Sequence, residues 1–213
     1  MHEGSILSNL PASLGRKVVN LNRSAISNVV LLGGTGSGKS SVAVHLAKLL
    51  GFGLFDTDSR LEARAGKKIS DIFAEQGESG FRSLETELLI SIGNIKNHVI
   101  VTGAGLVEME QNRKLLKNLG PAVWLATPVE SVVARLIMKP DELLSRPLLA
   151  PAVEIEDEDK RREFILKKLD SMLLARVSYY EEAEVVICSS YATAVDIAVQ
   201  IKAQLCNFSE IDL

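Results

Sequence analysis

The sequence predicts an α/β protein, a three-layer sandwich in which helices cover both faces of a five-stranded parallel sheet. Three observations indicate this fold class: short β-branched runs recur along the chain, amphipathic segments of helical period separate them, and a glycine-rich turn follows the first run. The runs are apolar almost throughout, which is typical of strands buried on both faces. One domain is expected, because 213 residues suit a single hydrophobic core.

The expected strands cover residues 29–32, 53–56, 99–102, 122–125 and 185–188. Apolar residues at helical spacing predict a helix after the first strand and another near residues 194–205. A third helix, over residues 157–182, is expected to be the longest. Residues 1–27 are expected to be an N-terminal extension, residues 28–205 the domain, and residues 206–213 a C-terminal tail.

The charge balance argues against nucleic-acid binding, because 24 Lys and Arg face 27 Asp and Glu, a net charge of −3. No apolar stretch reaches the roughly 18 residues that span a bilayer, so we expect a soluble cytoplasmic protein with no membrane partner. The cysteines, Cys188 and Cys206, are too few for a disulfide framework. His2, His45 and His98 are scattered singly, so no zinc site is expected.

A phosphate-binding loop is predicted at residues 33–40, Gly-Gly-Thr-Gly-Ser-Gly-Lys-Ser, which match Gly-x4-Gly-Lys-Ser between a strand and a helix. In such a loop backbone N–H groups surround a polyphosphate, Lys39 reaches the β and γ phosphates, and the Ser40 hydroxyl binds Mg²⁺. The motif alone does not separate kinases, switches and motors. The predicted ATP-binding residues of the loop are Gly33, Gly36, Ser37, Gly38, Lys39, Ser40 and Ser41.

Two carboxylates mark the end of the second expected strand: Asp56 is its last residue, and Asp58 follows two positions later. Both lie at the carboxyl edge of the predicted sheet, where phosphates bind. One carboxylate can hold Mg²⁺, directly or through water, and the other can accept a hydrogen bond from an acceptor hydroxyl and take its proton. In isolation an Asp-x-Asp pair would indicate only a solvated turn.

Three further segments carry a family resemblance: residues 77–85 (Gly-Glu-Ser-Gly-Phe-Arg-Ser-Leu-Glu), residues 102–105 (Thr-Gly-Ala-Gly) and residues 146–149 (Arg-Pro-Leu-Leu). Their order and spacing, together with the phosphate loop and a late Arg176, resemble the shikimate kinase family over residues 28–205. The resemblance implies a P-loop kinase fold with a mobile lid at about residues 138–155. It also implies transfer of a phosphoryl group from ATP to the 3-hydroxyl of shikimate, in aromatic amino acid biosynthesis, with Mg²⁺ as cofactor. We expect a monomer whose partners are ATP and shikimate.

Site roles follow from the resemblance residue by residue. Lys39 matches the phosphate-loop lysine, Ser40 and Asp56 match the Mg²⁺ site, and Arg146 matches the lid arginine that closes on the ATP phosphates. Asp58 matches the acid that contacts the acceptor hydroxyls. The catalytic residues are therefore expected to be Lys39, Asp58 and Arg146. We leave the adenine-stacking residue open, with Arg135 as the best candidate.

The resemblance implies substrate binding by Asp58, Arg82, Gly103, Ala104, Gly105 and Arg176. Arg82 and Arg176 match the two arginines that grip the substrate carboxylate, which suits a planar guanidinium. Independently of the resemblance, the helical spacing of the apolar residues places Arg176 at the border of the apolar stripe of its helix. A charge at that position requires an anionic partner. The family loop is Gly-Gly-Gly, so Ala104 departs from it; an active enzyme is expected if its φ is not positive. A kinase for another hydroxylated acid, such as gluconate, and a silent ATP-binding protein are the alternatives.

Overall fold

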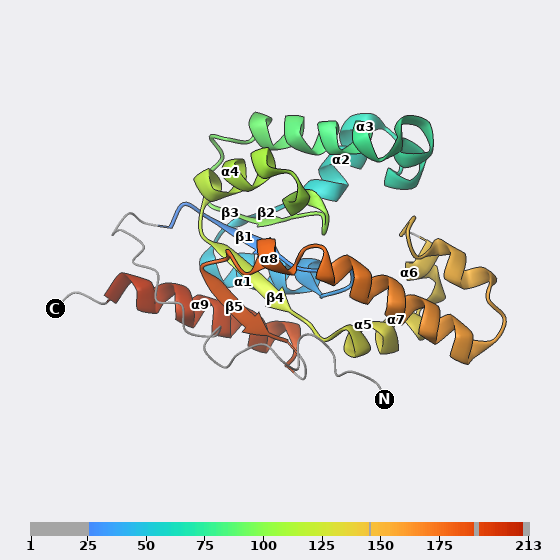
Figure 1. Cartoon of the computed structure of the whole chain (residues 1–213). Coiled ribbons are helices and arrows are strands. Elements are labelled where there is room, and N and C mark those ends of the chain that lie inside the picture. Colours follow the sequence, from blue (N-terminus) through green and yellow to red (C-terminus); the bar gives the residue numbers. More distant parts are fainter. Residues whose placement is uncertain (1–25, 145, 190–191, 211–213) are drawn as a thin grey trace.

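The α/β fold class is confirmed by the computed structural model, which describes residues 26–144, 146–189 and 192–210 (Figure 1). Five parallel strands form one sheet in the order β2-β3-β1-β4-β5. Their bounds are β1 Asn28–Leu32, β2 Gly53–Asp56, β3 His98–Val101, β4 Ala122–Ala126 and β5 Val185–Cys188. The expected strands therefore agree with the observed ones to within one residue at each end.

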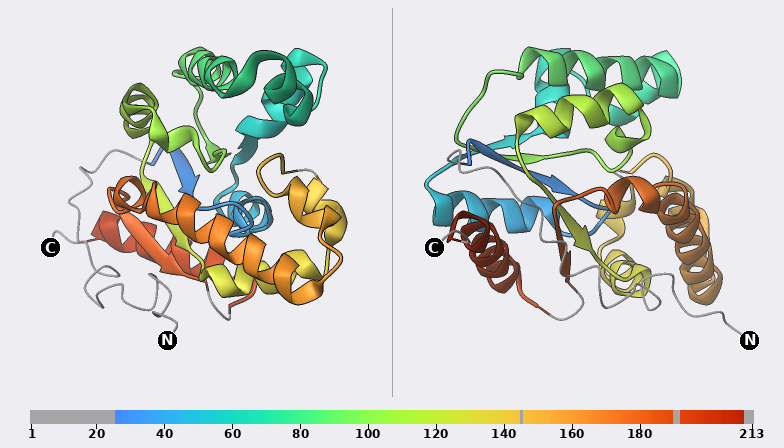
Figure 2. Two further views of the ribbon diagram at one scale, coloured as in Figure 1. Left: turned by 45° about the vertical axis from the view of Figure 1, so that its right-hand side comes forward. Right: turned by 60° about the vertical axis from the view of Figure 1, so that its left-hand side comes forward.

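Helices cover both faces of the sheet (Figure 2). On one face lie α1 (Lys39–Leu50) and α9 (Ala194–Glu210), and the other face is covered by α3 (Ile69–Ser91), α4 (Glu110–Leu119), α5 (Val129–Ile137) and α7 (Glu158–Leu174). The remaining helices are α2 (Thr57–Ala65), α6 (Pro140–Leu144), α8 (Val177–Tyr180) and the short 3-10 helices η3 (Leu106–Glu108) and η4 (Ala150–Glu154).

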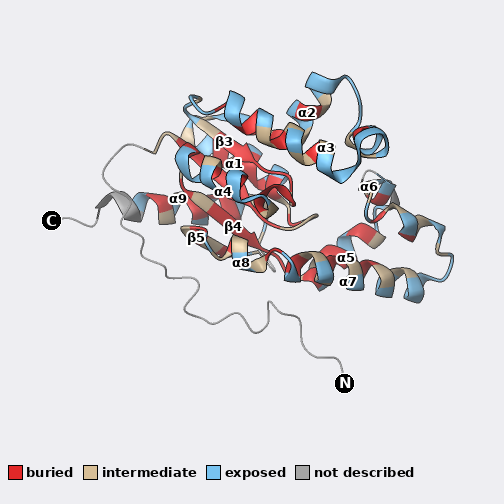
Figure 3. Ribbon diagram, turned by 45° about the horizontal axis from the view of Figure 1, so that its top comes forward, coloured by how far each residue is buried: buried red, intermediate tan, exposed pale blue. Residues whose placement is uncertain are grey.

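The core is divided by the central strand β1. Val30 and Leu32 face the layer of α3, α4, α5 and α7, whereas Val29 and Leu31 face α1 and α9. All four side chains are buried. Figure 3 shows that much of the sheet between the helix layers is buried in the same way. Since successive strand residues point to opposite faces, a strand covered on both sides has to be apolar at every position. This is why residues 29–32 of β1 form an unbroken apolar run.

The helix predicted over residues 157–182 is wrong in its extent, because the chain breaks it at Arg176. Arg176 has φ −121° and ψ −14° and separates α7 from α8. The break brings Tyr180 onto Trp124, with ring centroids 5.8 Å apart, so packing against β4 outweighs helix continuation. α3 spans 23 residues, but Gly77, with φ 67° and ψ −177°, interrupts it, so among the described residues α7 and α9, of 17 residues each, are the longest uninterrupted helices.

The structure describes only part of the expected extension and tail. Residues 1–25 and 211–213, which belong to the expected extension and tail, lie outside the described residues. Helix α9 continues past Leu205 to Glu210. The expected lid, residues 138–155, contains α6 and η4, which pack against each other. Within the described residues, no helix is both long enough and apolar enough to cross a bilayer.

Candidate active site

The predicted phosphate-binding loop connects β1 to α1. Gly36 and Gly38 have φ values of 74° and 91°, a left-handed conformation that favours glycine, and Gly38 caps the N-terminus of α1. Lys39, the first residue of α1, folds back over the loop, and its Nζ donates hydrogen bonds to the carbonyl oxygens of Gly33 (2.8 Å) and Gly34 (2.9 Å). The loop thus presents a cation beside a helix N-terminus, an arrangement that binds phosphate.

The electrostatics of Lys39 also favour an anionic ligand. Burial lowers the pKa of the Lys39 ammonium to about 8, while the carboxylates of Asp58 and Asp56 oppose the shift. A buried ammonium is costly unless negative charge compensates it. A bound polyphosphate would supply that charge.

Ser40 and Asp56 lie side by side at the carboxyl edge of the sheet. The Ser40 hydroxyl donates to Asp56 Oδ2 over 3.3 Å, and Asp56 Oδ1 accepts a 3.1 Å bond from the backbone N–H of Ser59, which caps α2. A hydroxyl and a carboxylate are oxygen ligands of the kind that Mg²⁺ prefers. Among the described residues, no group of three or more His, Cys, Asp and Glu side chains is arranged to hold a metal ion. An ion at this pair would take its other ligands from phosphate and water.

Asp58 offers an oxygen that no described residue uses. Its Oδ1 is buried and has no hydrogen-bond partner in the part of the chain that the structure describes. Burial raises the pKa of the Asp58 carboxyl, as does the neighbouring Asp56, while Lys39 opposes the shift. A carboxylate of raised pKa with a free oxygen suits acceptance of a hydroxyl proton.

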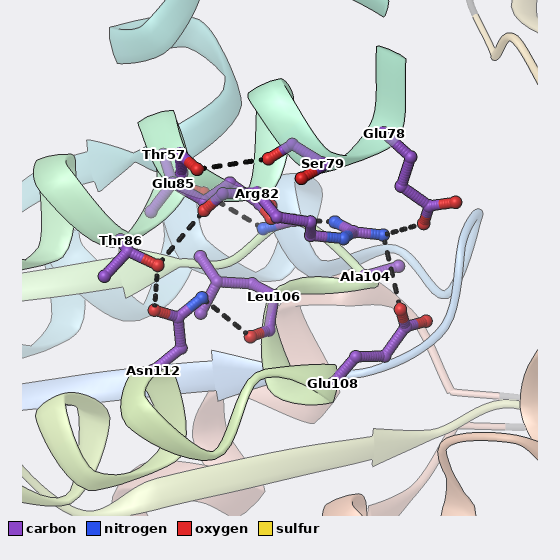
Figure 4. A network of polar contacts seen from close by, with 12 residues as sticks. Thr57, Glu78, Ser79, Arg82, Glu85, Thr86, Ala104, Leu106, Glu108 and Asn112 are labelled. Atoms are coloured by element: carbon purple, nitrogen blue, oxygen red, sulfur yellow. Dashed lines mark hydrogen bonds and ion pairs between the residues drawn. The ribbon is translucent and has the colours of Figure 1, made fainter.

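Arg82 and Arg176 are brought together by folding, although 94 positions separate them. Figure 4 shows Arg82 among three carboxylates, and its Nη1 donates to Glu85 Oε2 at 2.7 Å while its Nη2 lies 3.0 Å from Glu78 Oε1. Arg176 Nε donates to Glu108 Oε1 over 2.5 Å. Glu108 is thus the anionic partner that the position of Arg176 requires. Both arginine side chains are largely buried, with 11% and 7% exposed.

Glu85 and Glu108 were not among the residues expected from the sequence. Glu85 is 1% exposed, and burial raises the pKa of its carboxyl to about 7 even though Arg82 lowers it. Its signal was a charge four residues after Phe81 and three before Leu88, a position on the buried face of a helix. Glu108 had no such signal, because its partners lie 26 and 68 positions away.

The loop after β3 is shaped by close contacts. A Cβ on Gly103 would lie 2.7 Å from Asp58 Oδ1, and a Cβ on Gly105 would lie 2.7 Å from Arg82 Cζ. Ala104 meets no such limit from its backbone, because Asn97 is the one non-glycine residue with positive φ in the described part of the chain. The condition set for an active enzyme is therefore met at Ala104.

Two further arginines border the phosphate loop. Arg146 donates from Nη1 to the carbonyl oxygen of Glu142 over 2.8 Å, and its Nη2 lies 3.3 Å from Glu142 Oε2. Arg135, on α5, places its Nη1 3.6 Å from the point where a Cβ on Gly38 would lie. Both arginines line the same cavity as the phosphate loop, so they flank the site of the predicted nucleotide.

A single cavity of about 560 Å³ unites these groups. The α3 residues Ile69 and Phe73 line one side of it, and Val132 of α5 and Met172 of α7 line the other. The cavity contains every residue assigned to the site from the sequence except Gly33, whose carbonyl oxygen holds Lys39 from behind the loop. The expected residues that line it are Gly36, Ser37, Gly38, Lys39, Ser40, Ser41, Asp56, Asp58, Arg82, Gly103, Ala104, Gly105, Arg146 and Arg176.

The parallel sheet and the glycine-rich loop between β1 and α1 define a P-loop nucleotide-binding protein. The model of the family described as "Shikimate kinase" matches residues 35–206. Shikimate kinase of Microcystis aeruginosa is 38% identical over 175 residues, which cover 82% of this chain and 84% of that relative. Shikimate kinase of Persephonella marina is 42% identical over 144 residues, which cover 67% of this chain and 85% of that relative. The chain belongs to the shikimate kinase family.

Solved structures agree with this assignment. Shikimate kinase from Acinetobacter baumannii, in complex with shikimate, superposes with a TM-score of 0.75 at 34% identity, over 88% of this chain and 97% of that one. Shikimate kinase from Aquifex aeolicus superposes with a TM-score of 0.65 at 26% identity, over 86% and 98%.

Proposed function

We propose that the protein transfers the γ-phosphoryl group of ATP to the 3-hydroxyl of shikimate, giving ADP and shikimate 3-phosphate for aromatic amino acid biosynthesis. The observation that carries this function is the composition of the cavity. It joins a buried cation on a phosphate loop, an unused carboxylate oxygen and two largely buried arginines. Relatives named for shikimate support this substrate over gluconate, and the intact set of groups favours an enzyme over a silent ATP-binding protein.

The phosphate side of the reaction belongs to the loop and its neighbours. The loop N–H groups and Lys39 would bind the β and γ phosphates, and Arg146 would approach them from the lid. Ser40 and Asp56 would hold Mg²⁺, which neutralises developing charge on the phosphate oxygens when bound. The protein then contributes position and positive charge, which are the main requirements of phosphoryl transfer.

The acceptor side belongs to Asp58 and the arginine pair. Arg82 and Arg176 would bind the substrate carboxylate and so orient the ring. Asp58 Oδ1 would accept the proton of the attacking hydroxyl as the new oxygen–phosphorus bond forms and the bond to the ADP oxygen breaks. Ala104 and its glycine neighbours would form the wall against which the substrate lies.

Several finer expectations stay predictions. We propose a cytoplasmic monomer that acts without a membrane or nucleic acid. A net charge of −3 supports the absence of nucleic acid from its partners. The division into an extension, a kinase domain and a tail is likewise proposed.

The deciding experiment incubates the purified protein with MgATP and shikimate and follows ADP and shikimate 3-phosphate together. Gluconate replaces shikimate in a parallel assay, and Asp58→Asn serves as the control that keeps the shape of the site while removing the proton acceptor. We expect the wild-type protein to form product from shikimate but not from gluconate, and we expect Asp58→Asn to form little product. ATP binding without product, or faster product from gluconate, would overturn the proposal.

A further inference from the structure

Glu108 connects the two arginines that face the acceptor. Its Oε1 lies 2.5 Å from Arg176 Nε, and its Oε2 lies 3.5 Å from Arg82 Nη2. The side chain extends from the end of η3 toward Arg82 (Figure 4), and it also reaches Arg176. Its two carboxylate oxygens thus lie against the groups that we assign to the carboxylate of the substrate.

The positive charge of the arginine pair is already compensated by resident carboxyl groups before a ligand arrives. Two guanidinium groups contact three carboxylates, those of Glu78, Glu85 and Glu108. A ligand carboxylate entering this cluster would add a further negative charge to a largely buried site. Because buried like charges repel strongly, entry of the ligand favours withdrawal of one of the three resident carboxyl groups.

The structure favours Glu108 as the one that withdraws. Glu85 is 1% exposed and cannot leave without unpacking α3, and Glu78 contacts Arg82 but not Arg176. The Glu108 side chain is 33% exposed. Its backbone N–H donates to the carbonyl oxygen of Gly105 and its own carbonyl oxygen accepts from Arg113, so the backbone is fixed. Rotation of the side chain alone would release Arg176 and would remove one of the three carboxyl groups around Arg82.

We propose that the Glu108 carboxylate is an internal competitor of the substrate carboxylate: it occupies Arg82 and Arg176 in the free protein and is displaced when substrate binds. This inference rests on the proposed function, because it takes the arginine pair as the carboxylate site. Competition of this kind reduces the apparent affinity by the fraction of molecules in which the pair is free. Glu108 therefore sets the affinity for the acid acceptor without touching the reacting atoms.

The test compares the wild-type protein with Glu108→Gln, which keeps the size of the side chain and removes its charge. We expect the KM for shikimate to fall about fivefold, as for a pair that is free in roughly a fifth of molecules, with kcat and the KM for ATP unchanged. Glu108→Ala should act in the same direction. Glu110→Gln is the matched control, since Glu110 is an exposed carboxylate paired with Lys114 outside the cavity. An unchanged or raised KM for shikimate in both Glu108 variants would overturn the inference and leave the kinase function standing.

A second measurement needs no turnover. Phenylglyoxal modifies free guanidinium groups, and peptide mass spectrometry gives the rate at each arginine. Arg176 should react several-fold faster in Glu108→Gln than in the wild type or in Glu110→Gln. Equal rates of labelling would overturn the inference. If the wild-type protein is inactive on shikimate but Arg176 is labelled faster in the variant, shikimate is not the substrate, and the role of Glu108 still stands.

Discussion

The hydroxyl of Tyr180 donates a 2.6 Å hydrogen bond to the carbonyl oxygen of Ala104. Tyr180 is 1% exposed and stacks on Trp124, so the loop after β3 is tied to the core from beneath. Burial raises the pKa of the Tyr180 phenol, so it stays protonated and donates throughout the physiological range. The middle of the acceptor loop is therefore fixed through its backbone rather than through its side chain.

Tyr180→Phe should loosen this loop while keeping the ring in place. Loss of one neutral hydrogen bond costs about 1 kcal/mol, so we expect the KM for shikimate to rise about fivefold while the KM for ATP is unchanged. Steady-state kinetics with each substrate varied in turn measure the split. Tyr179→Phe is the control, because the Tyr179 ring packs on Arg113 outside the cavity. Equal losses in both variants would show that the bond to Ala104 has no special role.

Ala104→Gly should change kcat/KM for shikimate by no more than about tenfold, or roughly 1.4 kcal/mol, because the backbone at Ala104 does not need the freedom of glycine. Gly105→Ala is the contrasting variant. Its new Cβ would press on the Arg82 guanidinium, so it should reduce kcat/KM by far more. A wild-type protein silent on shikimate and rescued by Ala104→Gly would show instead that the methyl group blocks the site.

Lys39→Ala should lower kcat/KM, because it removes the cation at the β and γ phosphates. The loss should correspond to roughly 3 kcal/mol or more of transition-state stabilisation. The melting temperature should not fall, since the variant no longer buries an ammonium whose pKa is depressed to about 8. Calorimetric melting and kinetics on the same sample separate the two effects. Lys48→Ala, an exposed change in the same helix, should alter neither quantity. A Lys39→Ala enzyme of normal rate would remove this residue from the mechanism.

Arg82→Ala and Arg176→Ala should each raise the KM for shikimate more than the KM for ATP. Loss of a charged hydrogen-bond partner corresponds to about 1.5–3 kcal/mol. Varying each substrate at saturating concentration of the other gives the comparison. Arg64→Ala is a control from an arginine that is 58% exposed. If both KM values rise alike in the site variants, structural damage is the cause.

The stability of the protein should depend on pH through Glu85. The folded protein raises the pKa of this carboxyl from 4.5 to about 7, so it favours the protonated form. The resulting contribution to the free energy of unfolding is complete below about pH 4.5 and is lost as the pH rises through 7. Denaturant unfolding of the wild type and of Glu85→Gln from pH 5 to pH 8 should therefore show a difference that declines with pH. A difference that does not depend on pH would contradict the raised pKa.

Local signals in the sequence predicted the strands and the phosphate loop well. A buried parallel strand is an apolar run between turns, and the loop motif is contiguous, so both are visible without tertiary structure. The break at Arg176 was missed because it depends on the contact between Tyr180 and Trp124, 56 positions apart. The pairing of Glu108 with the two arginines was missed for the same reason. The φ of Ala104 likewise belongs to the folded loop and not to its composition.

The sheet order has a consequence for how such enzymes diverge. The phosphate loop leaves β1 and the acceptor loop leaves β3, and these strands are hydrogen-bonded neighbours. The spacing between donor and acceptor is thus inherited with the sheet ladder, whose strands lie about 4.8 Å apart. The residues that select the acid come instead from η3, α3 and the break before α8, at the periphery of that ladder. Substitutions in these segments can therefore change the acceptor while the groups that transfer the phosphoryl group stay in place.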